Sequence, residues 1–427
     1  MRQVVELVIE RLGGRGDGIA VHPDGRRLFV DGALAGERVR VQAPEGRRGG
    51  DEHWDLLEVL KPSDKRVDPP CPHATACGGC RLQHLALPAY ADFVADKIRS
   101  ALSTRGLDPA LVAPTDLSPP HSRRRIRLAW QRTASGMLLG MRQARSRRIV
   151  NLATCLIARP ELVALLPALR LVLGRLDSAS GEAALDHTPS GIDVLLLGER
   201  PPSPNDRTRL AQALADLPGV CRISWRAARE RQSETLVSLG EPLLQRGPAR
   251  VALAPGGFRQ ATREGETAML AFLNRHLQGA RQVADLFGGT GALGLGLDPL
   301  PARLQIVESD PGAVDATSKA LAAGIKGTKA SVLRRDLEKD PLRLPELRGT
   351  DAVILDPPRA GARSQCMVLA TSRIPQIGYV SCDPGSFARD ARILVDGGYR
   401  LMAVQPIGQF LWSDEVELAS YFRHEAA

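Results

Sequence analysis

Long hydrophobic runs are missing from the sequence, and their absence excludes a helix that crosses a membrane. No apolar stretch approaches the roughly 18 residues that such a helix needs. The opening residues, MRQVVELVIERLGG, are too charged for a secretory signal peptide. Internal repeats and a low-complexity tail are absent as well. We therefore expect a cytoplasmic protein whose 427 residues form two or three domains.

Acidic residues are outnumbered by basic ones. The chain has 48 Asp and Glu against 57 Lys and Arg, which gives a net charge of +9. This balance indicates a polyanionic partner such as nucleic acid, although a GC-rich genome that favours arginine codons would also produce it. Eight arginines in two strand-like segments would line a groove for phosphates or else form an ordinary solvated face: Arg123, Arg124, Arg125, Arg127, Arg142, Arg145, Arg147 and Arg148.

Cysteine is scarce, and its seven copies are unevenly placed. An odd number in a reducing compartment argues against a disulfide framework and favours metal binding or catalysis. The stretch CPHATACGGC holds three thiols in a C-x5-C-x2-C pattern, and a fourth stands apart in NLATCLIARP; these are Cys71, Cys77, Cys80 and Cys155. Such a set fits an iron–sulfur cluster or zinc, and His73 and His84 keep a mixed zinc site open. Cys221 and Cys366 match no motif.

Changes of pattern divide the chain into three parts of a multidomain α/β protein. Residues 1–62 alternate apolar and polar residues between turn clusters, which indicates a small OB-like β-barrel with a flexible loop at 45–53. A proline-rich boundary leads into a mixed α+β region, 63–250, which carries the clustered cysteines and the basic strands. Strands and helices alternate from 251 to 427, which is typical of a doubly wound, Rossmann-like domain.

A strand that contains an acid runs into a glycine-rich turn at VADLFGGTGALGL, residues 283–295. Asp285 precedes the turn, and Gly289 and Gly291 lie in it. Such a turn lets the backbone approach a ligand at the carboxyl ends of the strands. The next strand ends at Glu308, about 20 residues after the glycines, where an acid binds the ribose hydroxyls of a nucleoside. These features together resemble class I S-adenosylmethionine-dependent methyltransferases, although any tight turn needs glycine.

Two further strand ends, ILDPPRAG and YVSCDPG, carry reactive side chains. Asp356 ends the first, and Arg359 stands where amino-group methyltransferases have an aromatic residue. Cys382 ends the second; a thiolate that adds to C6 of a pyrimidine lets C5 take a methyl group, and a base must then remove the C5 proton. Glu415 and Glu417 alternate along a strand-like run, so only one of them faces the site. The alternatives are an ordinary proline-rich turn and a plain buried thiol.

Four motifs in this order, DLFGGTG, DPPRAG, SCDPGSFARD and the terminal VE, resemble the RNA uracil-5 methyltransferase family. The likeness covers nearly the whole chain and extends to the subgroup with an N-terminal TRAM domain and an iron–sulfur cluster. It implies that Cys382 is the nucleophile and Glu417 the base that abstracts the proton. It also implies an S-adenosylmethionine site, to which we assign Gln260, Asp285, Phe287, Gly289, Gly291, Glu308, Asp336 and Asp356. Gln260 and Asp356 would also face the uracil.

The same resemblance implies a further cofactor and a class of substrate. A 4Fe-4S cluster would bind Cys71, Cys77, Cys80 and Cys155 and would have a structural role near the RNA surface. The TRAM-like barrel and the central region would grip the RNA. We expect 23S rRNA as the substrate; a T-loop uridine of tRNA is the alternative, and a non-catalytic RNA-binding or assembly protein is the contrasting class. No obligate protein partner is evident, and a monomer is expected.

The chain departs from the family pattern at four positions. Thr262 stands in place of Asn, Gly288 in place of Cys, Ser386 in place of Thr, and Glu415 in place of His. The last change affects the surroundings of the base, because two nearby acids can raise one another's pKa. Glu415 would then share or take the role of Glu417.

Overall fold

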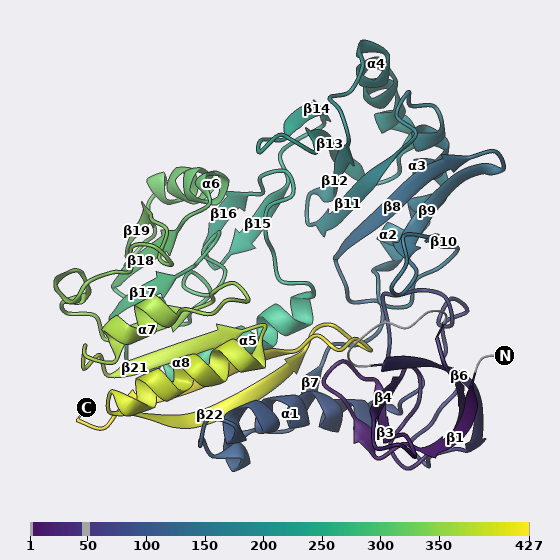
Figure 1. Ribbon diagram of the computed structural model, residues 1–427. Coiled ribbons are helices and arrows are strands. Elements are labelled where there is room, and N and C mark those ends of the chain that lie inside the picture. The colour runs from purple at the N-terminus through teal and green to yellow at the C-terminus, as the bar shows by residue number, and fades with distance from the viewer. Residues whose placement is uncertain (1–2, 45–51, 427) are drawn as a thin grey trace.

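Three large sheets organise the computed structural model, which describes residues 3–44 and 52–426 (Figure 1). Of the loop predicted at 45–53, only Glu52 and His53 belong to the described residues, and they begin strand β6 (Glu52–Lys61). Within the described ranges, no helix is both long enough and apolar enough to cross a membrane.

A small, curved, six-stranded sheet forms the N-terminal part (Figure 1). Its strands pair in the order β1-β5-β6-β4-β3-β2, and the other five are β1 (Val4–Val8), β2 (Arg11–Leu12), β3 (Gly18–Val21), β4 (Arg27–Val30) and β5 (Arg38–Gln42). The alternation along β5 buries Val39 and Val41 in a core that this sheet shares with no other part. On the opposite face, the positive charge of Arg40 is neutralised by ion pairs with Glu6 at 3.0 Å and with Glu58 at 2.6 Å.

The central part is a seven-stranded sheet with the order β10-β9-β8-β11-β12-β13-β14. Its strands are β8 (Arg125–Thr133), β9 (Gly136–Arg142), β10 (Ile149–Asn151), β11 (Ser180–Thr188), β12 (Gly191–Gly198), β13 (Val220–Ala227) and β14 (Glu234–Ser238). Three helices, α2 (Pro160–Ala164), α3 (Leu166–Gly174) and α4 (Pro204–Ala213), bury leucines with Trp130 and Trp225 in one core cluster. A two-stranded sheet, β15 (Leu243–Arg246) and β16 (Ala249–Ala252), leads into the C-terminal part.

The C-terminal part is an eight-stranded sheet with the order β19-β18-β17-β20-β21-β23-β22-β7. Its main strands are β17 (Gln282–Leu286), β18 (Arg303–Glu308), β19 (Lys329–Arg334), β20 (Ala352–Leu355), β21 (Gln376–Ser381), β22 (Tyr399–Gly408) and β23 (Glu417–His424). All described pairings are parallel except those of β23, which is antiparallel to both neighbours. The helices are α5 (Arg263–His276), α6 (Pro311–Ala322), α7 (Arg363–Leu369) and α8 (Pro384–Asp396). This is the doubly wound arrangement that the alternating pattern predicts.

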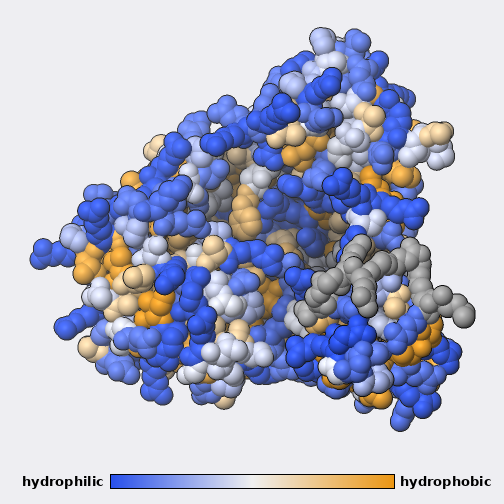
Figure 2. Space-filling view, viewed as in Figure 1, coloured by the Kyte–Doolittle hydropathy of each residue, from blue (hydrophilic) through white to orange (hydrophobic). Residues whose placement is uncertain are grey.

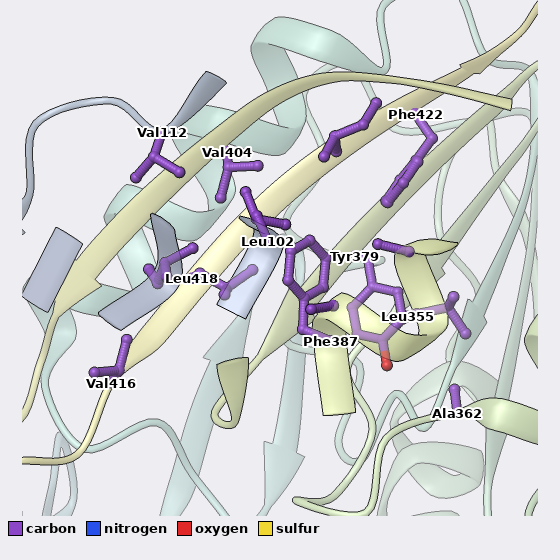
Figure 3. Packing of buried hydrophobic residues seen from close by; sticks show 14 of the residues in the cluster. Leu102, Val112, Leu355, Ala362, Tyr379, Phe387, Val404, Val416, Leu418 and Phe422 are labelled. Atoms are coloured by element: carbon purple, nitrogen blue, oxygen red, sulfur yellow. The ribbon is translucent and has the colours of Figure 1, made fainter. Parts of the chain in front are cut away.

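The segment between the N-terminal sheet and the central sheet packs with the C-terminal part. Helix α1 (Leu87–Ser103) lies against α8 and β22, and β7 (Asp116–Leu117) pairs with the end of β22. Leu102 of α1 shares one buried cluster with Tyr379 and Phe387 (Figure 3). Residues 87–117 therefore contribute to the C-terminal layer, whereas the sequence pattern assigned them to 63–250. The difference arises because α1 buries its apolar face against elements that follow it by almost 300 residues, and such a contact leaves no local signal.

The carboxyl ends of β17, β18, β20 and β21 meet at one edge of the sheet, because these strands run parallel. The glycine-rich turn, Asp356 and Cys382 each follow one of these strands. Figure 2 shows a largely hydrophilic surface that is hollowed where the C-terminal and central parts face each other. The fold thus gathers the motifs that the sequence analysis selected at one edge.

Candidate active site

The glycine-rich turn after β17 has a backbone conformation that suits close contact with a ligand. Phe287, Gly289 and Gly291 have φ values of 61°, 54° and 75°, in the left-handed region. At Gly288 an added Cβ would lie 2.8 Å from the carboxyl group of Asp285, so the turn packs directly on that side chain. The departure from Cys at Gly288 thus accompanies a tight turn; Gly289 faces open space, whereas Gly291 packs inward against Leu295 and Ile306.

The acids around this turn are held by backbone N–H groups. Asp285 is fully buried, its Oδ2 accepts a hydrogen bond from Gly294 at 3.0 Å, and burial raises its pKa to about 7. Glu308 accepts from Gly289 at 2.9 Å and from Asp310 at 2.7 Å. Asp336 follows β19 and forms an ion pair with Lys339 at 2.8 Å. These three carboxylates lie at the edge where the cofactor is predicted, and their contacts with a cofactor stay a prediction.

A chain of hydrogen bonds connects two acids next to Cys382. Gln260 donates from Nε2 to Asp356 Oδ2 at 3.1 Å, and Gln409 donates from Nε2 to Gln260 Oε1 at 2.9 Å. The same Nε2 of Gln409 donates to Glu417 Oε2 at 2.7 Å. Burial, with a smaller contribution from Asp285, raises the pKa of Asp356 to about 7. Burial, together with the charge of Asp356, raises the pKa of Glu417 to about 8.

Cys382 lies between the end of β21 and the start of α8. Its pKa is raised to about 12, mainly by burial and further by the charges of Glu417 and Asp356, whereas Arg359 lowers it. The thiol is therefore protonated in the resting protein, and the nucleophilic thiolate requires proton transfer at this site. The electrostatic coupling of Cys382 to both acids places Cys382, Glu417 and Asp356 in one group.

Glu415 and Glu417 occupy different environments. Glu417 is the first residue of β23 and is 3% exposed, whereas Glu415 precedes the strand and pairs with the exposed Arg359 at 2.5 Å. The alternation in the sequence predicts that only one of the two acids faces the site, and in the structure that acid is Glu417. Arg359, which stands where amino-group methyltransferases have an aromatic residue, thus forms an ion pair with Glu415.

Gln409 and Phe258 are site residues that the sequence analysis missed. Gln409 lies in the loop after β22, where a lone glutamine carries no recognisable pattern. Phe258 is 68% exposed two residues before Gln260, and the Arg125 guanidinium lies 5.7 Å from the centre of its ring. An exposed aromatic ring backed by a cation is a surface on which a nucleic-acid base can stack. Exposure cannot be read from the sequence, so neither residue had a usable signal.

The eight arginines considered for a phosphate groove or a solvated face occupy different environments. Arg124 is buried and forms an ion pair with Glu266 at 2.5 Å, while its Nε donates to the Gln260 carbonyl at 2.9 Å. Arg125 pairs with Asp186 at 3.3 Å, and Arg123 lies over the ring of Phe410. These three therefore join the central and C-terminal parts rather than face a phosphate backbone. The exposed members of the set are Arg127, Arg142, Arg145, Arg147 and Arg148.

The four cysteines from the two distant motifs line one small pocket: Cys71, Cys77, Cys80 and Cys155. Burial, together with the charges of the neighbouring thiols, raises the pKa of Cys80 to about 12. His73 also lines this pocket, but its Nε2 accepts from the Ala153 N–H at 3.2 Å, and His84 lies outside the lining.

The spacing of the sulfurs distinguishes two kinds of metal site. In the described part of the chain, ligand atoms of three or more His, Cys, Asp or Glu residues lie within 4.8 Å of one another only at Asp17, Asp31 and His53. No three of the four cysteine sulfurs thus lie as close to one another as the separation of roughly 4 Å that follows from tetrahedral zinc with Zn–S bonds of about 2.3 Å. The pocket therefore brings four thiols together without the close spacing of a preformed tetrahedral zinc site.

Comparison with known proteins identifies the class and then the family. No family model matches the chain. The tRNA (uracil-54, C5)-methyltransferase of Pyrococcus abyssi has the same fold, with a TM-score of 0.73, 19% identity, and coverage of 98% of this chain and 99% of that one. The fold is therefore that of an S-adenosylmethionine-dependent methyltransferase.

Relatives that are similar in sequence identify the family to which the chain belongs. An uncharacterized RNA methyltransferase of Caulobacter vibrioides is 38% identical over 98% of this chain and 99% of its own length. The 23S rRNA (uracil(1939)-C(5))-methyltransferase RlmD of Chromohalobacter salexigens is 33% identical over 92% of this chain and 84% of its own length. The chain belongs to this RNA methyltransferase family, as its motifs predict.

The raised pKa of Glu417 predicts a specific dependence of stability on pH. Between the ordinary pKa of 4.5 and about 8, the folded protein keeps a proton that the unfolded chain has released, so stability falls as pH rises through this window. The Glu417→Gln substitution removes the carboxyl group that binds this proton, so its contribution to the pH dependence disappears. We expect the free energy of unfolding of the wild type to fall relative to Glu417→Gln by up to about 1.4 kcal/mol per pH unit. Chemical denaturation at a series of pH values measures the difference.

Glu415→Gln is the matched control, because this acid is partly exposed and paired with Arg359. It should leave the pH dependence of the wild type in place. A constant difference between the wild type and Glu417→Gln across this window would show that Glu417 is ionised in the folded protein.

Proposed function

We propose that the protein transfers a methyl group from S-adenosylmethionine to C5 of a uridine in RNA. The observation that carries this proposal is the grouping of Cys382, Glu417 and Asp356 at the carboxyl edge of the sheet, beside the glycine-rich turn. The chemistry requires one thiol and one carboxylate within reach of the same pyrimidine and of the methyl donor. Family membership supports the RNA substrate.

In the proposed reaction, the Cys382 thiol loses its proton to water, its sulfur forms a bond to C6 of the uracil, and the electrons of the C5–C6 double bond move to C5 and the neighbouring carbonyl. C5 then attacks the methyl group, whose bond to the cofactor sulfur breaks. Glu417 takes the proton from C5, the C6–S bond breaks, and the thiolate is restored. Only the ionised form of Glu417 can take this proton, and with a pKa of about 8 a fraction of the protein has this form near neutral pH. The target base has to be unstacked from the RNA to reach the buried acid.

We propose 23S rRNA as the substrate. The support is the 33% identity to the relative from Chromohalobacter salexigens, whose name gives 23S rRNA and uracil C5. A T-loop uridine of tRNA is the alternative, favoured by the fold shared with the Pyrococcus abyssi enzyme, although at 19% identity that likeness concerns the fold alone. Phe258 and the exposed arginines of β9 and the following turn are the residues that we propose to contact RNA, with the barrel acting as a TRAM-like RNA-binding domain.

We also propose a 4Fe-4S cluster on Cys71, Cys77, Cys80 and Cys155, held in the pocket that these residues line. When bound, the cluster would cross-link the two cysteine motifs. Arg81 follows this segment and pairs with Asp17 and Asp31 of the barrel, each at 2.8 Å, while Leu82 N–H donates to the Trp412 carbonyl at 2.9 Å. The cysteine segment thus ties the barrel to the loop that carries Gln409, which supports a structural role.

Nucleoside analysis tests the proposed reaction. In a strain that lacks this gene, 5-methyluridine should disappear from 23S rRNA and persist in tRNA. The wild type and Cys221→Ser should restore it, because Cys221 lies in the central sheet and donates only to the Ile192 carbonyl. Cys382→Ala should not restore it. Unchanged 5-methyluridine in both RNA classes would refute the proposal, and binding of S-adenosylmethionine without methyl transfer would favour a non-catalytic RNA-binding protein.

Metal analysis tests the cluster. Protein purified without oxygen should contain about four iron atoms per chain with matching sulfide. Cys155→Ser should lose most of both, because it removes the ligand that the distant motif supplies, and Cys221→Ser should keep them. One zinc atom per chain and no sulfide would rule out the cluster.

A further inference from the structure

Gln409 is buried, 2% exposed, at the centre of the hydrogen-bond chain in the active site. Its Oε1 accepts from the backbone N–H of Ala261 at 3.0 Å. Its Nε2 donates to Gln260 Oε1 at 2.9 Å and to Glu417 Oε2 at 2.7 Å. All three contacts are internal, so the side chain has no direct role in proton transfer or methyl transfer.

One backbone group determines the orientation of two side-chain amides. The Ala261 N–H can only donate, so the Gln409 atom that faces it must be the oxygen. The NH2 group of Gln409 then faces Gln260 and Glu417 and donates one hydrogen bond to each. Gln260 must accept with its own oxygen, and this turns its NH2 group toward Asp356, 3.1 Å away. The opposite orientation of either amide would set two donors or two acceptors against each other.

This orientation leaves a defined pattern for a base. Gln260 uses one N–H on Asp356 and keeps a second N–H as a donor, next to the carboxylate of Asp356 as an acceptor. Uracil has the complementary edge, because its carbonyl oxygens accept and its N3–H donates. Cytosine has an unprotonated N3 that accepts and an amino group that donates. A Gln260 amide in the opposite orientation would offer an acceptor in place of the donor and would lose the preference for uracil.

We propose that Gln409 is a positioning residue that sets the preference for uracil over cytosine by fixing the orientation of the Gln260 amide. The proposal rests on the proposed function, since it concerns the base at the same site. The orientation passes along three groups that are hydrogen-bonded in sequence: the Ala261 N–H, the Gln409 amide and the Gln260 amide. Of these, only Gln260 contacts Asp356. Gln409 acts through Gln260 and also holds the Glu417 carboxyl group in place.

Gln409→Glu reverses the lock. A glutamate still accepts from the Ala261 N–H, but even when it is protonated it has only one hydrogen, for which Gln260 and Glu417 compete, so the Gln260 amide is free to turn its NH2 group toward position 409. Gln409→Met removes the lock and keeps a similar volume. The control is Gln405→Met on the preceding strand β22, where Gln405 donates to the Pro114 carbonyl at 2.7 Å and has no described contact with the active-site chain.

The test compares kcat/KM on two versions of the 23S rRNA transcript that the wild type methylates, with U or C at the modified position. Sites that hydrogen-bond a substrate group reject analogues without it by about 10⁴–10⁵. We expect the U-over-C ratio to fall at least about tenfold in Gln409→Glu, to fall less in Gln409→Met, and to stay unchanged in Gln405→Met. Loss of folding alone would lower both rates and leave the ratio unchanged.

The outcomes separate the two claims. If the wild type methylates neither transcript nor tRNA, the proposed function fails, and the assignment of Gln409 fails with it. If the wild type methylates the U transcript and both Gln409 variants keep its U-over-C ratio, only the assignment of Gln409 is overturned.

Discussion

The hydrogen-bond chain between two buried carboxyl groups is the interaction on which the active site depends. Asp356 and Glu417 have raised pKa values because the fold removes them from water, and both raise the pKa of Cys382. Unpaired acids at such depth would cost several kcal/mol. The amides of Gln260 and Gln409 satisfy one oxygen of each acid, so the acids stay beside the thiol without an ion pair that would neutralise them.

A second set of buried contacts connects this chain to the rest of the molecule. Glu266 on α5 pairs with Arg124 at 2.5 Å and with Arg246 at 2.8 Å, and Arg246 Nε donates to Thr290 in the glycine-rich turn at 3.1 Å. Arg124 also binds the backbone of Gln260. Removing one member of a buried ion pair typically costs about 3–5 kcal/mol. The central part therefore helps to position both the glycine-rich turn and Gln260.

Much of the C-terminal fold follows from local patterns. Short apolar runs that end in Asp285, Glu308, Asp356 and Cys382 predict parallel strands, and parallel strands bring those ends to one edge without further information. The methyltransferase fold and the RNA methyltransferase family are confirmed by the comparisons, and the individual roles of Cys382, Glu417 and the cofactor residues stay predictions.

Other features depend on contacts between distant parts of the chain. Gln409 meets Gln260 across 149 residues, and Arg124 meets Glu266 across 142, so no local pattern distinguishes them from loop glutamine or surface arginine. The same reason explains why the packing of α1 against the C-terminal part has no signal in the local sequence. It also explains why Glu415 seemed to compete with Glu417, since its partner Arg359 is 56 positions away.

The central claim is that Cys382 attacks C6 of a uracil and that a base then removes the C5 proton. RNA substrate with 5-fluorouridine at the target position tests it most directly, because fluorine replaces the proton and the last step cannot occur. Incubation with S-adenosylmethionine, followed by digestion and mass spectrometry, should find a covalent 5-methyl-5-fluorouridine adduct on Cys382 and none in Cys382→Ala. An adduct on another residue would contradict this mechanism. So would an enzyme that methylates unmodified RNA but forms no adduct with the fluorinated RNA.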